Sequence, residues 1–386
     1  MRYAHIVGWG AYVPDRVLNN NEIATFVDTS DEWIYSRTGI RERRIAGEKE
    51  TTATLAFEAA ARALKVADLH PSQVDLIIVA TSTPEYVFPS TACRVQDYLG
   101  AKRAGAFDLS AACSGFVYGL DMAAQAIRTG AIHTAIVIGA ETLSRVVDWR
   151  DRATCILFGD GAGAVVLRGS DVPGGVLASI LRSDGSGGNL LSLPAVYHNP
   201  VPTLGPEYLH LNGHRKNMIY MEGRPVFRFA TQVVGEIIEQ TLAKAGLTIQ
   251  DVDLVIPHQA NTRILETAAR KLKVSPDLFF TNIEQLGNTS SASIPIALCD
   301  VVAAGRLRPD DTLVFVGFGG GLTWAATVIK WDVTRPPVSL LDREWRRVRY
   351  VVARGRSRWR KFIRRLYNWL AGSPTPEARL KDAGKK

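Results

Sequence analysis

The stretch Ala106-Phe-Asp-Leu-Ser-Ala-Ala-Cys113-Ser-Gly-Phe-Val-Tyr-Gly-Leu-Asp-Met-Ala-Ala-Gln-Ala-Ile-Arg-Thr-Gly130 decides the fold. Its pattern predicts a short buried strand, a tight turn of small residues and a helix of about four turns that Gly130 ends. Cys113 lies where the strand passes into the helix, so unpaired backbone N–H groups and the positive end of the helix dipole favour its thiolate. Because free cysteine is among the most buried residue types, a structural cysteine is the competing interpretation.

The composition is that of an ordinary soluble globular protein. Of the 386 residues, 46% are hydrophobic and 22% are charged, and the length suffices for two domains or one duplicated domain. We expect no signal peptide, because the N-terminus predicts a strand that leads into a turn, and no apolar run approaches the roughly 18 residues that cross a bilayer. The cysteines form no Cys-x-x-Cys pair and predict a reducing, cytoplasmic location; they are Cys93, Cys113, Cys155 and Cys299.

The net charge of +8 is divided unevenly along the chain. Residues 335–386 hold 16 Lys and Arg against 4 Asp and Glu, which gives +12. Residues 1–334 therefore hold 30 against 34, which gives −4. The charge pattern thus predicts a mildly acidic globular body with a strongly basic tail.

The sequence contains an internal repeat of helix, turn and strand. Residues 64–78 match residues 242–256 at an offset of 178. Residues 135–139, which form an apolar run ending in glycine, match residues 313–317 at the same offset. Ordered matches at one offset indicate that the chain is two copies of one α/β unit.

The duplication also predicts where a site lies. Between the matched segments, Cys113–Gly130 corresponds to Asn288–Gly305 at an offset of 175. Halves that pack about a pseudo-dyad would bring Cys113 and Asn288 together at the middle of the molecule. The predicted units are an N-terminal half (residues 1–175), a C-terminal half (residues 176–332) and an extension (residues 333–386).

Polar residues in the second half occupy positions where α/β proteins bind ligands. His258 follows an apolar strand and precedes a helix predicted for Thr262–Leu272, although a lone histidine is more often structural. Asn288 opens another helix, where it is either the N-cap or a neutral donor to a substrate oxygen that gains negative charge. Gly317-Phe-Gly-Gly-Gly321 is either a plain turn or a place where backbone N–H groups approach an oxyanion.

Two other motifs do not predict a site. Gly159-Asp-Gly-Ala-Gly163 is followed by a strand pattern and not by the helix that a dinucleotide fingerprint requires, so a hairpin turn explains it better. His210 and His214, with His198, lie in a segment rich in Pro and Gly without helical periodicity, and we expect no metal there.

With Cys113, His258 and Asn288, the chain resembles the β-ketoacyl-acyl carrier protein synthase III family of the thiolase superfamily over about residues 3–332. The resemblance rests on motifs that occur in this order: Asp28-Thr-Ser-Asp-Glu-Trp-Ile34, Arg37-Thr-Gly-Ile-Arg-Glu-Arg43, Ala111-Ala-Cys-Ser-Gly-Phe116, Phe158-Gly-Asp-Gly-Ala-Gly163, Pro257-His-Gln-Ala-Asn261, Gly287-Asn288 and Phe318-Gly-Gly-Gly321. It implies a thiolase-like five-layered αβαβα fold and a homodimer. It also implies a cofactor-free condensation that initiates fatty acid or related polyketide synthesis.

The resemblance also implies roles for individual residues. Cys113 would attack an acyl-CoA, and the backbone N–H groups of Cys113 and Gly320 would form the oxyanion hole. Malonyl-acyl carrier protein would then lose CO2 while His258 and Asn288 stabilise the enolate. A cysteine activated by its helix, opposite two groups that favour an oxyanion, suits this thioester chemistry.

Further residues would bind the two substrates. By resemblance, Trp33 would stack on the adenine of CoA with the help of Arg152, and Phe88 would reach into the acyl pocket of a second subunit. The path of pantetheine and phosphates would be lined by Arg37, Gly223, Phe227 and Asn261. The acidic carrier protein would contact Arg228, Gln259 and Arg263.

Other functions stay open at this point. A related condensing enzyme or acyltransferase could join two acyl-CoAs or move an acyl group to another acceptor, and Glu85 would support the first if it faced the cysteine. A non-catalytic acyl-CoA-binding or membrane-scaffold protein would need Cys113, His258 and Asn288 to be inert.

The basic tail does not belong to the family pattern. Residues 344–370 place large apolar residues on one helical stripe: Trp345, Val348, Val352, Trp359, Phe362, Ile363, Leu366, Trp369 and Leu370. Much of the remaining surface is basic: Arg346, Arg347, Arg356, Arg360, Lys361, Arg364 and Arg365. This pattern is typical of a helix that lies on a membrane surface, and a helix packed on the body or a solvated tail is the alternative. No nucleic-acid-binding fold is recognised.

Overall fold

The structure, a computed structural model, describes residues 2–194 and 218–332 and six separate positions near the C-terminus. These positions are Gly355, Trp359, Phe362, Ile363, Leu366 and Tyr367. The histidines that were considered for a metal (His198, His210 and His214) lie outside the described residues, as does most of the predicted amphipathic tail.

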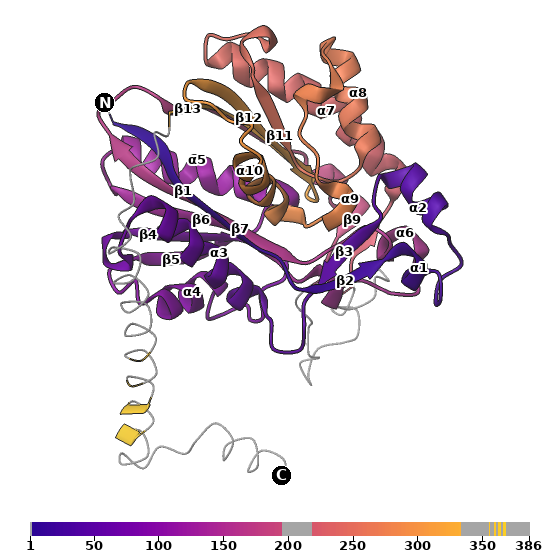
Figure 1. Cartoon of the computed structure of the whole chain (residues 1–386), viewed down its shortest axis with the longest axis horizontal. Coiled ribbons are helices and arrows are strands. Elements are labelled where there is room, and N and C mark those ends of the chain that lie inside the picture. Colours follow the sequence, from indigo (N-terminus) through magenta and orange to yellow (C-terminus); the bar gives the residue numbers. More distant parts are fainter. Residues whose placement is uncertain are drawn as a thin grey trace, which may run out of the picture.

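Two β-sheets form the frame of the molecule (Figure 1). The first has the strand order β1 (Tyr3–Tyr12), β7 (Gly161–Ser170), β6 (Thr134–Glu141), β4 (Leu76–Ala80) and β5 (Gly105–Leu109). The second has the order β11 (Leu254–Pro257), β12 (Asp311–Gly319), β13 (Thr323–Trp331) and β8 (Gly175–Ser183). β4 runs parallel to β5 and β6, and β11 runs parallel to β12. Loops at the carboxyl ends of these parallel strands are therefore the expected place for a site.

Helices cover both sheets and separate them (Figure 1). The outer face of the first sheet packs against α3 (Thr52–Ala67) and α4 (Thr91–Leu99). The outer face of the second packs against α7 (Gly223–Lys244) and α8 (Thr262–Leu272). Between the sheets lie α5 (Gly115–Arg128) and α10 (Ser293–Ala303). The order helix, sheet, helix, sheet, helix confirms the predicted five-layered αβαβα fold.

Short elements surround one end of this frame (Figure 1). They are β2 (Arg16–Asn19) paired with β3 (Glu42–Ile45), β9 (Leu191–Ser192) paired with β10 (Tyr220–Met221), and the helices α1 (Asn20–Ile23), α2 (Asp31–Thr38), α6 (Arg152–Cys155) and α9 (Ile283–Leu286). Most of the polar segment that precedes α3 in the sequence thus lies beside the frame.

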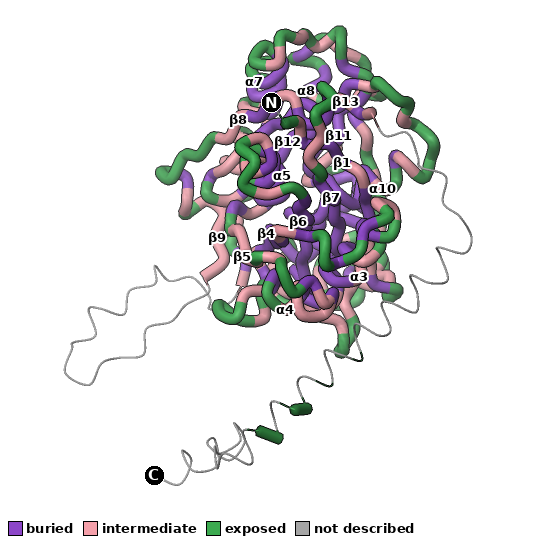
Figure 2. The backbone as a smooth tube through the Cα atoms, turned by 90° about the vertical axis from the view of Figure 1, so that its left-hand side faces the viewer, coloured by how far each residue is buried: buried purple, intermediate pink, exposed green. Residues whose placement is uncertain are grey.

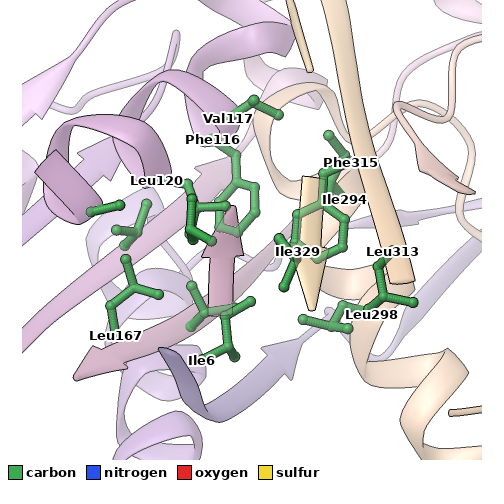
Figure 3. Close-up of a cluster of buried hydrophobic side chains, with 14 of the residues drawn as sticks. Ile6, Phe116, Val117, Leu120, Leu167, Ile294, Leu298, Leu313, Phe315 and Ile329 are labelled. Carbon is green, nitrogen blue, oxygen red and sulfur yellow. The ribbon is translucent and has the colours of Figure 1, made fainter. Parts of the chain in front are cut away.

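The middle layer carries a core that both halves share. Figure 3 shows side chains of α5 and α10 meeting between the two sheets, with Phe116 on α5 and Phe315 on β12. Both rings are fully buried, and their centroids lie 6.3 Å apart. Burial of each such side chain contributes roughly 2–3 kcal/mol. Figure 2 shows the same division, with buried residues along the strands and exposed residues over outer loops and helices.

The halves repeat each other in detail at the predicted offset of 178. Asp75 accepts the Thr134 N–H at 3.0 Å, and Asp253 accepts the Thr312 N–H at 2.7 Å. Each aspartate thereby fixes the start of the strand beside its own. The division of the chain after residue 175 stays a prediction.

The predicted equivalence of Cys113 and Asn288 is wrong. The turns η2 (Ala112–Ser114) and η8 (Ser290–Ala292) precede α5 and α10, and Ala112 and Ser290 adopt nearly the same positive φ, 43° and 49°. The counterpart of Cys113 is therefore Ser291, at the offset of 178. The offset of 175 aligned the glycines that end the two helices, and it fails here because α5 has 14 residues and α10 has 11.

The strand before Cys113 was expected to be buried, and the structure places it at the edge of a sheet. The strand before Cys113 is β5, which is the edge of its sheet and only half-buried in the single chain. The predicted helix at Thr262–Leu272 is confirmed as α8.

Candidate active site

Cys113 lies in the turn between β5 and α5 and is 7% exposed. The end of β12 passes directly over it. A Cβ atom on Gly319 would lie 3.0 Å from the Cys113 sulfur, and one on Gly317 would lie 3.2 Å from the Cys113 carbonyl oxygen. Glycine at these two positions therefore allows the close approach of β12 to the nucleophile candidate.

Thr323 joins the Cys113 turn to the Gly320 turn. Its Oγ1 lies 3.0 Å from the Ala111 carbonyl oxygen and 2.9 Å from the Gly320 carbonyl oxygen. The Ser114 hydroxyl donates to the Thr323 carbonyl at 3.0 Å. These contacts hold Gly320 beside the turn of Cys113, where the resemblance puts an oxyanion hole.

His258 follows β11 and is 1% exposed. Its Nδ1 lies 3.1 Å from the Ser293 hydroxyl, and the ring meets the edge of Phe318 with centroids 5.1 Å apart. Burial lowers the pKa of His258 to about 3, against the opposing effect of a hydrogen bond to the Ser290 backbone. The imidazole is therefore neutral at physiological pH.

Asn288 is held by its backbone on both sides. Its N–H donates to the Leu157 carbonyl at 2.9 Å, and its carbonyl accepts the Gly159 N–H at 3.0 Å. The side-chain Oδ1 accepts the Ser290 N–H at 2.8 Å, which leaves the amide NH2 as a donor. The N-cap interpretation is wrong for α10, since that helix begins at Ser293 with Ala292 as its cap.

The thiol of Cys113 is not a preformed thiolate. Burial raises its pKa to about 12, and a hydrogen bond with the Ser290 side chain acts in the opposite direction. The sequence predicted a thiolate because the start of a helix lowers the pKa of a thiol. The loss of water around the buried sulfur, which raises the pKa, was not included in that prediction. By these pKa values both the Cys113 thiol and the His258 imidazole are neutral near pH 7.

Four of the predicted CoA-binding residues are linked by contacts: Trp33, Arg37, Arg152 and Asn261. The guanidinium carbons of Arg37 and Arg152 lie 4.6 Å and 4.9 Å from the centroid of the Trp33 ring. The Asn261 amide donates to the Arg37 carbonyl at 2.8 Å, and its oxygen caps α8 by accepting the Arg263 N–H.

These contacts continue onto α7. The Arg263 guanidinium lies 5.6 Å from the centroid of Phe227. Gly223 is exposed and begins α7, and the exposed Arg228 follows in the same helix. The side chains of α2, α6, α7 and α8 therefore make one basic and aromatic surface.

The expectation that Gln259 contacts a carrier protein is wrong in this conformation. Gln259 is 1% exposed, and its amide donates to the carbonyls of Pro257 and Phe280. Its oxygen accepts from the Thr281 hydroxyl and the Asn282 N–H. With its donors and acceptor in use, Gln259 fixes the loop that carries His258.

The loop before α4 is the most exposed apolar part of the body. Tyr86, Val87 and Phe88 are 57%, 72% and 84% exposed. Glu85 accepts the Ala53 N–H and pairs with Arg94 at 2.9 Å. Its carboxylate is thus held by α3 and α4, which gives no support to the alternative that it serves the cysteine.

Sequence reasoning missed several residues that hold the site together: Glu141, Ser290, Ser293, Phe318 and Thr323. One signal was available for Glu141, because a lone carboxylate ends the otherwise apolar run Thr134–Glu141. The serines after Asn288 gave no comparable signal, since serine is common at helix starts.

No cluster of three or more His, Cys, Asp or Glu able to hold a metal occurs in the described part of the chain. Among the same residues, every helix is too short or too polar to cross a membrane. The four cysteines are free.

The comparisons with known proteins agree with this geometry. Residues 107–185 match the profile of 3-Oxoacyl-[acyl-carrier-protein (ACP)] synthase III, and residues 242–331 match the profile of its C-terminal part. The chain is 50% identical over 327 residues to the beta-ketoacyl-[acyl-carrier-protein] synthase III of Desulfitobacterium hafniense, which covers 85% of this chain and 97% of that protein.

Solved structures give the same result. The 3-oxoacyl-[acyl-carrier-protein] synthase III of Aquifex aeolicus is 46% identical with a TM-score of 0.78, covering 85% of this chain and 99% of that one. The priming beta-ketosynthase of the R1128 polyketide pathway is 36% identical with a TM-score of 0.79, covering 87% of this chain and 98% of that one. These relatives are shorter, so this chain carries residues beyond their length.

Proposed function

Because the chain belongs to the β-ketoacyl-[acyl-carrier-protein] synthase III family, we propose that it condenses an acyl-CoA with malonyl-acyl carrier protein through Cys113. The observation that supports this assignment is that the turn of Cys113 packs against η8, the turn that positions His258 and Asn288. The Ser290 N–H donates to Oδ1 of Asn288, and the Ser293 hydroxyl lies 3.1 Å from Nδ1 of His258. The chain is thus an acyltransferase whose product initiates fatty acid, or related polyketide, synthesis.

In the first step the Cys113 sulfur attacks the thioester carbonyl. The new C–S bond replaces the bond to CoA, and the thiol proton leaves with the CoA sulfur. Since the pKa of the thiol is about 12, the proton must leave as the C–S bond forms. The N–H groups of Cys113 and Gly320 hold the tetrahedral oxyanion.

In the second step malonyl-carrier protein loses CO2, and the electron pair of the broken C–C bond forms an enolate. The enolate carbon then forms the new C–C bond to the carbonyl carbon of the acyl-enzyme. Thr289 donates to Ser293, so the Ser293 hydroxyl can donate to Nδ1 of His258. In that tautomer the Nε2–H, with the Asn288 amide, stabilises the enolate oxygen. Cys113 leaves as the thiolate and takes up one proton from solvent, so the products are a β-ketoacyl-carrier protein, CO2 and the free Cys113 thiol, and no cofactor is needed.

Intact mass spectrometry tests this mechanism. Acetyl-CoA and longer acyl-CoAs should each add one acyl mass to the wild type and none to Cys113→Ala, and malonyl-carrier protein should remove it. An adduct in Cys113→Ala contradicts the nucleophile. An adduct that malonyl-carrier protein never discharges favours the acyltransferase alternative, and no adduct at all favours a non-catalytic acyl-CoA-binding protein.

The basic and aromatic surface supports a binding path for both substrates. We assign the adenine of CoA to Trp33 between Arg37 and Arg152, and the acidic carrier protein to Arg228 and Arg263. Trp33→Ala should raise KM for acyl-CoA alone, while Arg228→Glu should raise KM for malonyl-carrier protein alone. If either substitution raised KM for both substrates equally, acyl-CoA and the carrier protein would not bind to separate sets of residues.

A homodimer follows from the same proposal. The exposed Phe88 and the open edge of β5 are surfaces that a second copy would cover. Light scattering should give twice the mass of the chain, and Phe88→Asp should reduce both dimer and acylation. A monomer with full activity would contradict this assignment.

The second candidate function concerns residues 344–370. The described Trp359, Phe362, Ile363 and Leu366 follow helical spacing and are 39–61% exposed, so an apolar stripe faces solvent. We propose that this stripe inserts into an anionic membrane surface, with the neighbouring Arg and Lys on the lipid headgroups. The full chain should sediment with anionic vesicles and not with neutral ones, whereas a chain ending at residue 334 should remain in solution. Equal sedimentation of both chains would exclude the membrane contact.

A further inference from the structure

The pseudo-symmetry of the fold gives the Cys113 turn a second copy, in which Ser291 takes the place of Cys113. A Cβ atom on Gly317 would approach the Cys113 carbonyl oxygen at 3.2 Å. One on Gly139, its equivalent, would approach the Ser291 carbonyl oxygen at 2.1 Å. Each half therefore packs the end of a central strand against the equivalent turn of the other half.

The two copies differ at one decisive position. Beside Cys113 lies Gly319, which has no side chain and so places none against the sulfur. At the equivalent position beside Ser291 lies Glu141, which is fully buried. The copy at Ser291 is thus filled by a carboxyl group and cannot receive a substrate.

The Glu141 carboxyl is bound from two directions. From its own half it accepts the Ser82 N–H at 3.0 Å and the Thr83 hydroxyl at 2.7 Å. From the other half the Ser291 hydroxyl lies 2.9 Å from Oε1 of Glu141 and 2.8 Å from the Ala80 carbonyl oxygen. A buried carboxyl with partners on both sides ties the two elements together, since loss of one partner leaves a desolvated polar group.

The turn that Glu141 holds carries the second-step residues. Ser291 is the middle residue of η8, which is separated from Asn288 by Thr289 and leads into α10 at Ser293. Asn288 is oriented by the Ser290 N–H, and Ser293 contacts Nδ1 of His258. Thr323, which lies outside η8, contacts the carbonyls of Ala111 and Gly320 and so holds the first-step turns together.

We propose that Glu141 is a positioning residue for the decarboxylation step, acting through Ser291 and the η8 turn on Asn288 and His258. This inference rests on the proposed function. Burial raises the pKa of Glu141, against the effect of its hydroxyl and N–H donors.

Three variants test the proposal, each followed in both half-reactions. Glu141→Gln keeps the shape but replaces one carboxyl oxygen by an NH2 group, and Ser291→Ala removes the hydroxyl that contacts both Glu141 and the Ala80 carbonyl. Thr83→Val is the matched control, because it removes a shorter hydrogen bond to the same carboxyl on the side away from η8. Acylation by acetyl-CoA and discharge of the preformed acyl-enzyme by malonyl-carrier protein are timed by intact mass.

Glu141→Gln and Ser291→Ala should slow discharge about tenfold or more while acylation changes less than about threefold, since a shift of about 1 Å in a positioned group can cost 100-fold. Thr83→Val should preserve the ratio of the two rates. An equal fall in both half-reactions, or the same ratio in Thr83→Val, would overturn the proposal. If Glu141→Gln fails to fold, Glu141→Asp, which keeps the carboxyl group but shortens its reach to Ser291, takes its place. A wild type that is never acylated would instead refute the proposed function.

Discussion

The reactivity of Cys113 depends on its burial more than on its helix. A thiolate stabilised by the start of α5 would be largely formed at neutral pH, whereas the burial of the sulfur raises its pKa to about 12. The acyl-CoA must therefore enter a site that holds a neutral thiol and a neutral imidazole. This distinction is measurable without any substrate.

Alkylation of Cys113 by iodoacetamide should accelerate roughly tenfold for each pH unit between pH 7 and pH 10, without a plateau, because only the thiolate reacts and its fraction keeps growing below the pKa. Peptide mass spectrometry over time gives the rate at each pH. Cys93, which is exposed in the same chain, is the internal control for the reagent. A Cys113 rate that levels off below pH 9 would show that the thiol is a stabilised thiolate after all.

β12 passes so close to the Cys113 sulfur that a side chain at Gly319 would disturb the nucleophile. A methyl group at Gly319 would lie 2.8 Å from the Cys113 Cβ, so either the turn or the strand must move. Gly319→Ala should slow acylation by about 100-fold, because small displacements of a reacting group are costly.

Gly185→Ala is the matched control for that substitution, since nothing lies within 4 Å of its added Cβ. It should acylate at the wild-type rate. Intact-mass time courses with acetyl-CoA compare the two variants, and equal rates in both would mean that the β12 contact has no role in reactivity.

Residue chemistry in the sequence pointed to Cys113, His258 and Asn288, but not to the groups that hold them. Gln259 lies in a motif that resembles a carrier-protein contact, and only the structure shows that it is buried and fully hydrogen-bonded. Glu141 is far from Cys113, His258 and Asn288 along the chain, and the pseudo-dyad brings it to Ser291. Contacts between the halves depend on how the two halves pack together, and a single sequence does not show directly which residues that packing brings into contact.

At the scale of elements, the middle layer is where the halves depend on each other. Phe116→Ala should lower the free energy of unfolding by about 3–5 kcal/mol, because the fully buried ring meets Phe315 between the sheets and its loss leaves a cavity. Denaturant unfolding followed by circular dichroism measures the change.

Met122→Ala on the same helix is the comparison, since Met122 is 45% exposed. It should cost less than about 0.5 kcal/mol. If both substitutions cost the same, α5 is stabilised by its own helix propensity and not by its packing between the sheets.

Hydrophobic periodicity in the sequence predicted which segments form helices and strands, but it predicted their first and last residues less well. The helix Thr262–Leu272 was predictable because its apolar stripe is regular and Asn261 caps it. The register of the turn before α10 was not, because α10 is shorter than α5 and the terminal glycines misled the alignment. The edge position of β5 could not be predicted either, since a short apolar run looks alike in a central strand and an edge strand.

At the scale of the whole molecule, the duplication made the layered fold predictable. Each of the two α/β units has a sheet of apolar strands, so both faces of each sheet must be covered by helices. Because α5 and α10 lie between the sheets, they cover the inner faces of both (Figure 1). The added residues at the C-terminus follow no such rule. Their amphipathic pattern predicts a surface and leaves its partner to experiment.

The first and last strands of the described body are tied together by an ionisable pair. His5 on β1 contacts Asp332, just after β13, and its Nε2 lies 2.9 Å from the Val172 carbonyl oxygen. The hydrogen bond to Asp332 raises the pKa of His5 above its usual value, against the effect of burial. A histidine whose pKa is higher in the folded state stabilises the fold fully below about pH 6.5, and this contribution is lost as pH rises through the folded pKa.

The thermal midpoint of the wild type should therefore fall more steeply with rising pH above about 6.5 than that of Asp332→Asn, in which the His5 pKa is no longer raised. Other titrating groups are common to both chains, so the difference between the two curves isolates the His5 pair. His133→Gln, which changes another histidine lining the same cavity, should keep the wild-type slope. Scanning calorimetry at one scan rate measures all three chains, and parallel curves for wild type and Asp332→Asn would show that the ends of the fold are held by packing alone.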